Sequence, residues 1–208
     1  MEQDYLLIYD KYISFLDKLS LLVSESEKRV INSSDPLFID NVNFFSRSYL
    51  INLCTYLEAY LTEIATKLFE RHCKCVNQYS VPEMFISASL SSWSVKNRVV
   101  REYSLSYSKD DIENFFDANK ISGNIKKTFN VFELLGIELK HVINDKSIKD
   151  QITSIVDKRN DIIHRNDDGM DISLLDIISY INTVKCYMEL IKKAVIESAY
   201  KTLSVTKN

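Results

Sequence analysis

Apolar residues recur along most of this chain at alternating spacings of three and four, which is the period of one face of an α-helix. The final segment gives the clearest series: Leu174, Ile177, Ile181, Val184, Met188, Ile191 and Val195. The first segment has a similar series and predicts a helix ending near Asn32: Tyr5, Ile8, Tyr12, Phe15, Leu19 and Leu22. The sequence shows neither strand alternation of any length nor an internal repeat. The pattern therefore predicts an all-α fold.

A second long helix is predicted from Asp35-Pro36, an N-cap followed by proline at the first helical position, to about Tyr79. One apolar stripe along it contains Leu50, Leu53, Leu57, Ile64 and Leu68. A neighbouring stripe contains Ile51, Cys54, Glu58, Leu61 and Ala65. A helix that is apolar on two faces belongs at the centre of a bundle. Glu58 is the charged exception on the second stripe, so it needs a cationic or hydrogen-bonding partner there.

Residues 80–144 have a shorter and more broken pattern than the rest of the chain. It predicts short helices around Lys96–Tyr107, Asp110–Asn119 and Asn124–Leu134. Because this region lacks a long apolar helix of its own, we interpret it as an insertion in one domain that spans residues 1–208. The expected architecture is a bundle of about four long helices with a shorter helical insertion.

Within this insertion, Trp93, Lys96 and Arg98 offer an aromatic ring and two cations close together in sequence. Such a group could stack on a base and bind a phosphate, so these residues are candidate RNA contacts. The alternative is that Trp93 fills the edge of a core, which is the commoner role of a tryptophan in a loop.

The segment from about Lys146 to Asn166 is the other long helix, and its apolar stripe contains an exception. Ile148, Ile152, Ile155 and Ile162 follow the helical spacing, but Arg159 occupies a position where an aliphatic residue is expected. A guanidinium is always charged and carries five donors, so burying it is costly unless an anionic group meets it. Glu58 is the best candidate for that group. After this helix, Ser173-Leu174-Leu175-Asp176 resembles a capping box that starts the final helix.

Composition and charge narrow the possible functions. Only 3 Gly and 2 Pro in 208 residues favour long uninterrupted helices, and 46% apolar residues are typical of a globular protein. No apolar run is long enough to cross a bilayer, and the first residues, Met1-Glu2-Gln3-Asp4, are acidic where a secretory signal would be basic. These features predict a cytoplasmic protein. A net charge of −3 provides no global attraction for nucleic acid, so any RNA contact must be local.

The four cysteines suggest reduced thiols. Cys73 and Cys75 are two residues apart on a predicted helix, which is poor geometry for a disulfide and agrees with a reducing compartment. The run His72-Cys73-Lys74-Cys75 looks like part of a metal site, but the chain has no second Cys/His pair at the usual spacing. The sequence therefore predicts neither a metal nor a cofactor.

Arg159, Asn160 and His164 form the most informative group in the chain. On a helix, Asn160 and His164 are about 40° apart, and Arg159 is about 140° from His164 but long enough to reach round. An Arg to hold nonbridging oxygens, an amide to orient them and a base that titrates near neutrality suit a phosphodiester. This chemistry requires no metal.

These residues resemble the motif of the HEPN (higher eukaryotes and prokaryotes nucleotide-binding) domains, in which Arg, commonly followed by Asn, precedes His by a short spacer. The resemblance implies an all-helical bundle and a metal-independent endoribonuclease of a toxin or antiviral-defence system. It assigns catalysis to Arg159, Asn160 and His164. Independently, the charge of Glu58 on an apolar stripe predicts that it positions Arg159, and the positive charge of Arg165 makes that residue a further candidate RNA contact. The resemblance also implies a homodimer with a composite active site, because one chain carries a single motif. A cognate antitoxin or defence partner is a further implied partner.

Some HEPN toxins carry a modified Tyr two residues after the motif His, but this chain has Asn166 there, which argues against that regulation.

Three alternatives remain open at the level of the sequence. In the first, Arg159 pairs with Glu58 for stability alone, and His164 only favours the end of its helix through the helix dipole. In the second, the chain is a non-catalytic HEPN-like module that binds RNA, a nucleotide or a partner protein in a defence complex. In the third, it is a helical scaffold or antitoxin-like subunit that binds no RNA.

Overall fold

The computed structural model describes residues 2–78, 109–118, 121–165 and 171–205. Every regular element in these residues is a helix, which confirms the predicted all-α class. The four long helices are α1 (Glu2–Ile31), α3 (Val42–Gln78), α8 (Lys146–Arg165) and α9 (Leu174–Val205). The short helices are α2 (Pro36–Asp40), α5 (Lys109–Ala118), α6 (Ile125–Leu134) and α7 (Leu139–Val142).

The chain divides into two compact units. The first contains residues 1–65 and 120–208, and the second contains residues 66–119. In the second unit, Phe69 near the end of α3 packs on Phe115 of α5, with ring centroids 4.7 Å apart. The described part of the predicted insertion is therefore shared: α5 belongs to the second unit, whereas α6 and α7 belong to the first.

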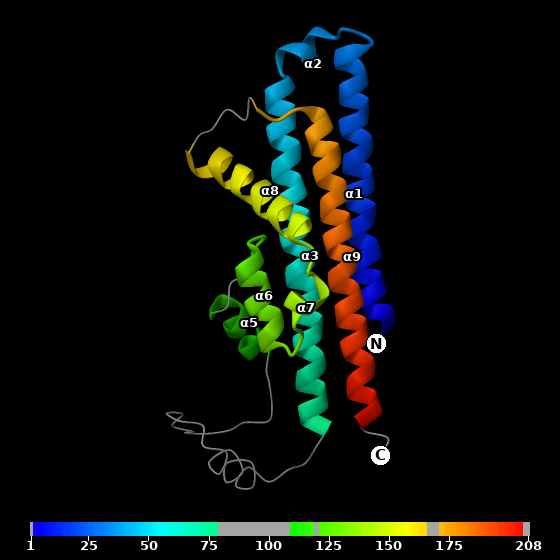
Figure 1. Cartoon of the computed structure of the whole chain (residues 1–208), viewed down its shortest axis with the longest axis vertical. Helices are drawn as coiled ribbons and strands as arrows, with labels where there is room; N and C mark the ends of the chain where they lie inside the picture. The colour runs from blue at the N-terminus through cyan, green and yellow to red at the C-terminus, as the bar shows by residue number, and fades with distance from the viewer. Residues whose placement is uncertain (1, 79–108, 119–120, 166–170, 206–208) are drawn as a thin grey trace. The chain divides into compact units, whose positions relative to one another are not determined.

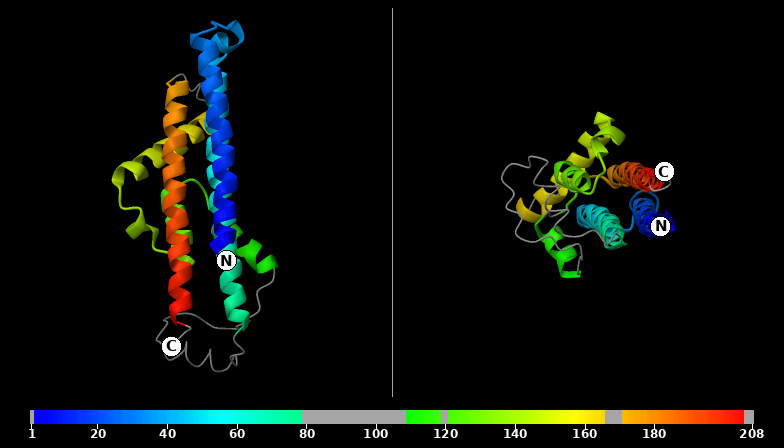
Figure 2. Two further views of the ribbon diagram at one scale, coloured as in Figure 1. Left: turned by 90° about the vertical axis from the view of Figure 1, so that its right-hand side faces the viewer. Right: turned by 90° about the horizontal axis from the view of Figure 1, so that it is seen from below.

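In the first unit, α1, the part of α3 up to Ala65 and α9 run side by side (Figures 1 and 2). The predicted stripe of α9 is buried along its whole length, from Leu174 to Val195. Hydrogen bonds tie the helices together: the Tyr60 hydroxyl of α3 donates to the Met188 carbonyl of α9 at 3.0 Å, and the Tyr12 hydroxyl of α1 donates to Glu63 of α3 at 2.8 Å. Residues from both predicted stripes of α3 are buried in this unit, Leu50 and Leu57 from one and Cys54 and Leu61 from the other. This burial agrees with the predicted central place of α3.

The buried face of α1 differs from the predicted one. The sequence series places Phe15 and Leu22 in the core, but Phe15 is half-buried and Leu22 is 56% exposed. Leu16 and Val23 are buried in their place. An alternating three-four spacing has a period of about 3.5, whereas a straight helix has about 3.6, so the core face advances by one residue over a few turns.

The predicted helix from Pro36 to Tyr79 is interrupted at Asn41, between α2 and α3. Asn41 leaves the helical conformation, with φ −119° and ψ 18°, and its side-chain amide donates to the Leu37 carbonyl at 2.9 Å. Asparagine commonly competes with the backbone in this way and so ends helices. The N-cap prediction was right, because the Asp35 carboxylate accepts from the Leu37 N–H at 3.0 Å.

The helix α8 lies obliquely across α3 and α9 (Figure 1). Ile152 and Ile155 are buried in this crossing, whereas Ile148, at the start of the predicted stripe, is half-buried. The predicted capping box at the start of α9 is present: the Asp176 carboxylate accepts from the Ser173 N–H at 2.9 Å, and the Asp176 N–H donates to the Ser173 hydroxyl at 3.1 Å.

Predictions for the shorter helices can be compared where the structure describes them. The helices expected at Asp110–Asn119 and Asn124–Leu134 correspond to α5 and α6. The sequence did not predict α7, since four residues are too few to show a helical period. The helix expected at Lys96–Tyr107 lies outside the described residues. No helix among the described residues combines the length and apolar character needed to span a membrane.

Candidate active site

The site is built around Arg159, one turn after the buried Ile155 on α8. Its Nη2 donates to Oε2 of Glu58 on α3 at 2.8 Å. Both side chains are largely buried, with exposed fractions of 19% for Arg159 and 27% for Glu58. The expected contact between these two exceptions to the apolar pattern is therefore present. Each supplies the opposite charge that the other needs at that depth.

The Glu58 carboxylate has a second partner. Its Oε1 accepts from the backbone N–H of Gly123, in the segment just before α6, at 3.3 Å. The two carboxylate oxygens thus bind two different elements, a backbone amide on one side and α8 on the other. This arrangement fixes the direction in which Glu58 presents its charge to Arg159.

Asn160 is also engaged by Arg159. The Arg159 Nη1 donates to Oδ1 of Asn160 at 3.0 Å. Because the amide oxygen is used in this bond, the Asn160 amide offers its N–H donors to any ligand. The Nε of Arg159 is buried and has no hydrogen-bond partner among the described residues. The donors left for an anionic ligand are therefore the Asn160 N–H groups and the second N–H of each terminal nitrogen of Arg159.

His164 lies in the last turn of α8 and is exposed. It is off the buried stripe, which ends at Ile162. Asn160 lies one turn earlier on the same face of the helix and is half-buried. The motif therefore extends from Arg159, which is largely buried and held by Glu58, to the solvent-accessible imidazole of His164.

Cys54 lies one turn before Glu58 on α3, and its thiol points to the Ile155 carbonyl at 3.9 Å. Burial raises the pKa of this thiol to about 12, although the positive charge of Arg159 works in the opposite direction. Cys54 is therefore a neutral thiol at physiological pH, and the structure gives it a packing position beside the ion pair.

Several sequence-predicted residues cannot be placed at the site. Trp93, Lys96 and Arg98 lie outside the described residues. Arg165 is the last residue of α8, and its side chain is outside the description. In the described part of the chain, no group of three or more His, Cys, Asp or Glu is placed to hold a metal ion, and Cys54, Cys73 and Cys186 form no disulfide there.

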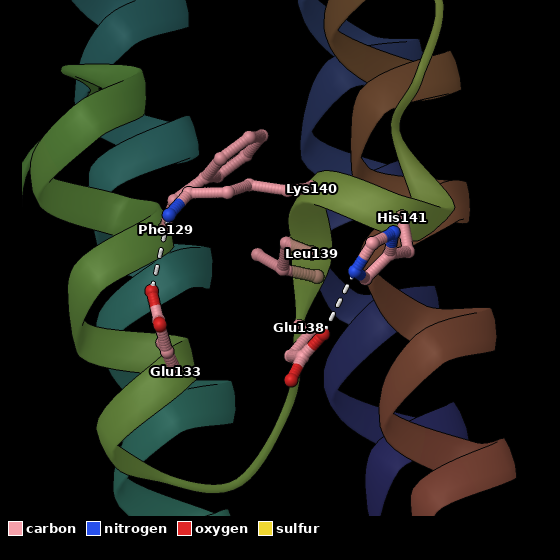
Figure 3. A pocket seen from close by; sticks show the side chains of 6 residues that line it. All are labelled: Phe129, Glu133, Glu138, Leu139, Lys140 and His141. Carbon is pink, nitrogen blue, oxygen red and sulfur yellow. Dashed lines mark hydrogen bonds and ion pairs between the residues drawn. The ribbon is translucent and has the colours of Figure 1, made fainter.

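A separate concave surface, which the sequence did not indicate, lies beside α6 and α7 (Figure 3). It has a volume of about 210 Å³ and an apolar floor of Phe129 and Leu139. The ion pair of Lys140 with Glu133 at 3.3 Å borders it, as does a contact of 2.9 Å between Nε2 of His141 and a carboxylate oxygen of Glu138. None of the motif residues lines this pocket.

Comparison with known proteins identifies the family. A sequence model of the RiboL-PSP-HEPN family matches residues 10–197, which include the motif and most of the helices around it. The chain belongs to the RiboL-PSP-HEPN family. The HEPN resemblance based on Arg159, Asn160 and His164 is thus confirmed at the level of the family. HEPN membership is compatible with a ribonuclease or with an RNA-binding module. No curated protein and no solved structure gives a significant match to this RiboL-PSP-HEPN chain.

Proposed function

We propose that this RiboL-PSP-HEPN protein is a metal-independent endoribonuclease, with Arg159, Asn160 and His164 as its catalytic residues. The observation that carries the proposal is the arrangement of donors at one end of α8. Arg159 is pinned by Glu58 at 2.8 Å and bonded to Asn160 at 3.0 Å, and the exposed His164 follows on the face of Asn160. A fixed cation, an amide donor and a titratable base are the groups that phosphodiester transfer needs.

In the proposed reaction, the ribose 2′-oxygen attacks the adjacent phosphorus and the bond to the 5′-oxygen breaks. His164 takes the proton of the 2′-hydroxyl or delivers one to the departing 5′-oxygen. The products are a 2′,3′-cyclic phosphate and a 5′-hydroxyl. DNA lacks the 2′-hydroxyl and is not cut by this route. Single-stranded RNA is the expected substrate, because its backbone can turn into line for attack.

Arg159 and Asn160 would stabilise the charge that builds on the nonbridging oxygens. Glu58 accepts one N–H of Nη2 and Asn160 accepts one N–H of Nη1, so each terminal nitrogen keeps a second N–H that can meet a phosphate. Glu58 is then a positioning residue rather than a catalytic one. Its negative charge also keeps Arg159 in place when no RNA is bound.

A homodimer completes the proposed site. Each chain carries one copy of the motif, and a symmetric contact would bring two copies of Arg159 and His164 to one cleft. Two guanidinium groups there would supply the local positive charge that a chain of net charge −3 lacks overall. Arg165, Trp93, Lys96 and Arg98 remain candidate RNA contacts. A cytoplasmic role in a toxin or antiviral-defence system, with a cognate antitoxin or defence partner, belongs to the same proposal.

The test is cleavage of labelled single-stranded RNA in excess chelator, with the protein's mass measured in solution. We expect a dimer that cleaves RNA, and a folded, dimeric His164→Ala variant that does not. His141→Ala is the matched control, because His141 is also exposed but lies on α7, where it pairs with Glu138. Undiminished cleavage by His164→Ala would remove this residue from the mechanism. A strict monomer at micromolar concentration would contradict the composite site.

One observation favours a second candidate, a non-catalytic RNA-binding module. Arg159 already bonds to Glu58 and to Asn160, so two of its three nitrogens are engaged without a substrate. Such a module would bind the same RNA with equal affinity before and after the His164→Ala change and would cleave it in neither case. Measuring binding and cleavage on one RNA therefore separates the two functions.

A further inference from the structure

The segment just before α6 comes unusually close to α8 at Gly123. A Cβ atom built on Gly123 would lie 2.7 Å from Cγ2 of Val156 and 3.8 Å from Oε1 of Glu58. Real Cβ atoms essentially never approach another heavy atom to 2.7 Å, so a larger residue here would force a neighbour to move. The absence of a side chain is what lets the Gly123 N–H reach Glu58 at 3.3 Å.

Val156 has little freedom to move away. It is 5% exposed, and a β-branched side chain on a helix strongly prefers one χ1 rotamer. It also lies three residues before Arg159 on α8, so the two side chains are neighbours on the helix surface. An added methyl group at position 123 would therefore displace the segment that carries the Gly123 N–H.

We propose that Gly123 is a positioning residue for Arg159. Its N–H fixes one oxygen of Glu58, the other oxygen of Glu58 fixes Nη2 of Arg159, and Nη1 of Arg159 fixes Asn160. Three elements that are distant in sequence thus set the direction of the guanidinium. Gly123 itself touches neither substrate nor reacting atoms in this arrangement.

The first test is the Gly123→Ala variant in RNA cleavage, a readout that rests on the proposed ribonuclease function. A misplaced guanidinium weakens a transition-state contact, so we expect kcat to fall about tenfold while KM changes less than about twofold. Adding Val156→Ala removes the Cγ2 methyl group that the new Cβ would strike, together with Cγ1, which lies at an ordinary contact distance of 3.6 Å. The double variant should therefore recover kcat to within about threefold of the parent protein. Val156→Ala alone controls for the lost packing.

The second test does not depend on any activity. In a protein with ¹⁵N-labelled arginine, the signals of Arg159 are assigned by their loss in Arg159→Lys. A guanidinium held by Glu58 rotates slowly about its Cζ–N bonds, which gives separate Nη signals. We expect these signals to merge in Gly123→Ala, as in Glu58→Gln, and to separate again in Gly123→Ala/Val156→Ala.

Each outcome decides the proposal. Merged signals in Gly123→Ala and separate signals in the double variant support it, even if the parent protein cleaves no RNA and the ribonuclease proposal alone fails. Unchanged Arg159 signals in a folded Gly123→Ala protein overturn it. A folded double variant whose signals stay merged also overturns it, because relief of the Val156 contact should restore the hydrogen bond.

Discussion

The helices α8 and α9 have similar sequence patterns but different roles in the molecule. Both carry aliphatic residues at alternating spacings of three and four, and both pack into the first unit. On α9 the stripe runs unbroken from Leu174 to Val195, and every member is buried. On α8 the stripe contains Arg159, whose charge is met by Glu58 of α3.

This difference distinguishes residues that stabilise the fold from residues that are candidates for catalysis. The α9 stripe gains its free energy from removing apolar surface from water, which needs no partner of a particular kind. Arg159 is acceptable at its position only because Glu58 compensates its desolvation. An exception to an apolar pattern that finds such a partner is a good candidate for a functional residue. Substitutions on α9 should therefore cost mainly stability, and substitutions in the motif of α8 mainly activity.

The sharpest test of this separation is His164→Ala. We expect cleavage of single-stranded RNA to fall by about 10³-fold, within the range of a lost general acid or base. The melting temperature should change little, because His164 is exposed at the end of α8. Cleavage assays and thermal unfolding on the same preparation, with His141→Ala beside them, measure both effects. A large loss of stability in His164→Ala would show that His164 belongs to the architecture.

The converse test is Ile181→Ala on α9. Ile181 is fully buried, so we expect a loss of about 2–5 kcal/mol in the free energy of unfolding from lost burial and the cavity left behind. The activity of the molecules that remain folded should be unchanged. Leu175→Ala is the matched control, since Leu175 is on the same helix but 62% exposed. Denaturant unfolding gives the free energies, and a similar loss in both variants would contradict the assigned core.

The interaction free energy of the Arg159–Glu58 ion pair can be measured by a double-mutant cycle of Arg159→Met and Glu58→Gln. We expect each single change to destabilise the protein and the double change to cost less than their sum, with a coupling of about 1–2 kcal/mol. The double variant should nevertheless remain inactive, because the cation is gone. Lys158→Ala is a useful control, since Lys158 is the neighbouring cation on α8 and pairs with Asp171. Additive single effects would mean that the two side chains have no interaction energy with each other.

The smallest expected effect is that of Ser173→Ala at the start of α9. Loss of the capping box should cost about 1 kcal/mol at neutral pH. The hydrogen bond from the Ser173 side chain holds the pKa of Asp176 below its ordinary value of 3.8. A carboxylate with a lowered folded-state pKa stabilises the protein above its unfolded-state pKa, and this contribution is lost as the pH falls through the folded value. The difference between parent and variant should therefore shrink below about pH 4, as acid unfolding can measure. A difference that stays constant over this range would contradict the Ser173–Asp176 contribution.

The family and the candidate residues could be predicted from the sequence because both depend on short-range patterns. Helical periodicity, the Asp35 cap and the capping box at Ser173 are local in the chain. The structure confirms the helical class and both caps, although the buried face of α1 and the break at Asn41 differ from the predicted pattern. The spacing of Arg159, Asn160 and His164 is local in the same sense. Glu58 and Arg159 could be singled out because each carries a charge on an apolar stripe.

The sequence predicted that Glu58 and Arg159 meet, but only the tertiary structure decided the geometry of their contact. Glu58 and Arg159 are 101 residues apart, and their contact depends on the oblique crossing of α8 over α3. The role of Gly123 had no sequence signal, because the need for a residue without a side chain arises only when Val156 of another helix is close to it. The shift of the α1 core face to Leu16 and Val23 has a local cause instead, because a stripe of period 3.5 drifts on a helix of period 3.6. Local periodicity determines which helices form, and the shapes and charges of distant side chains determine which atoms they bring together.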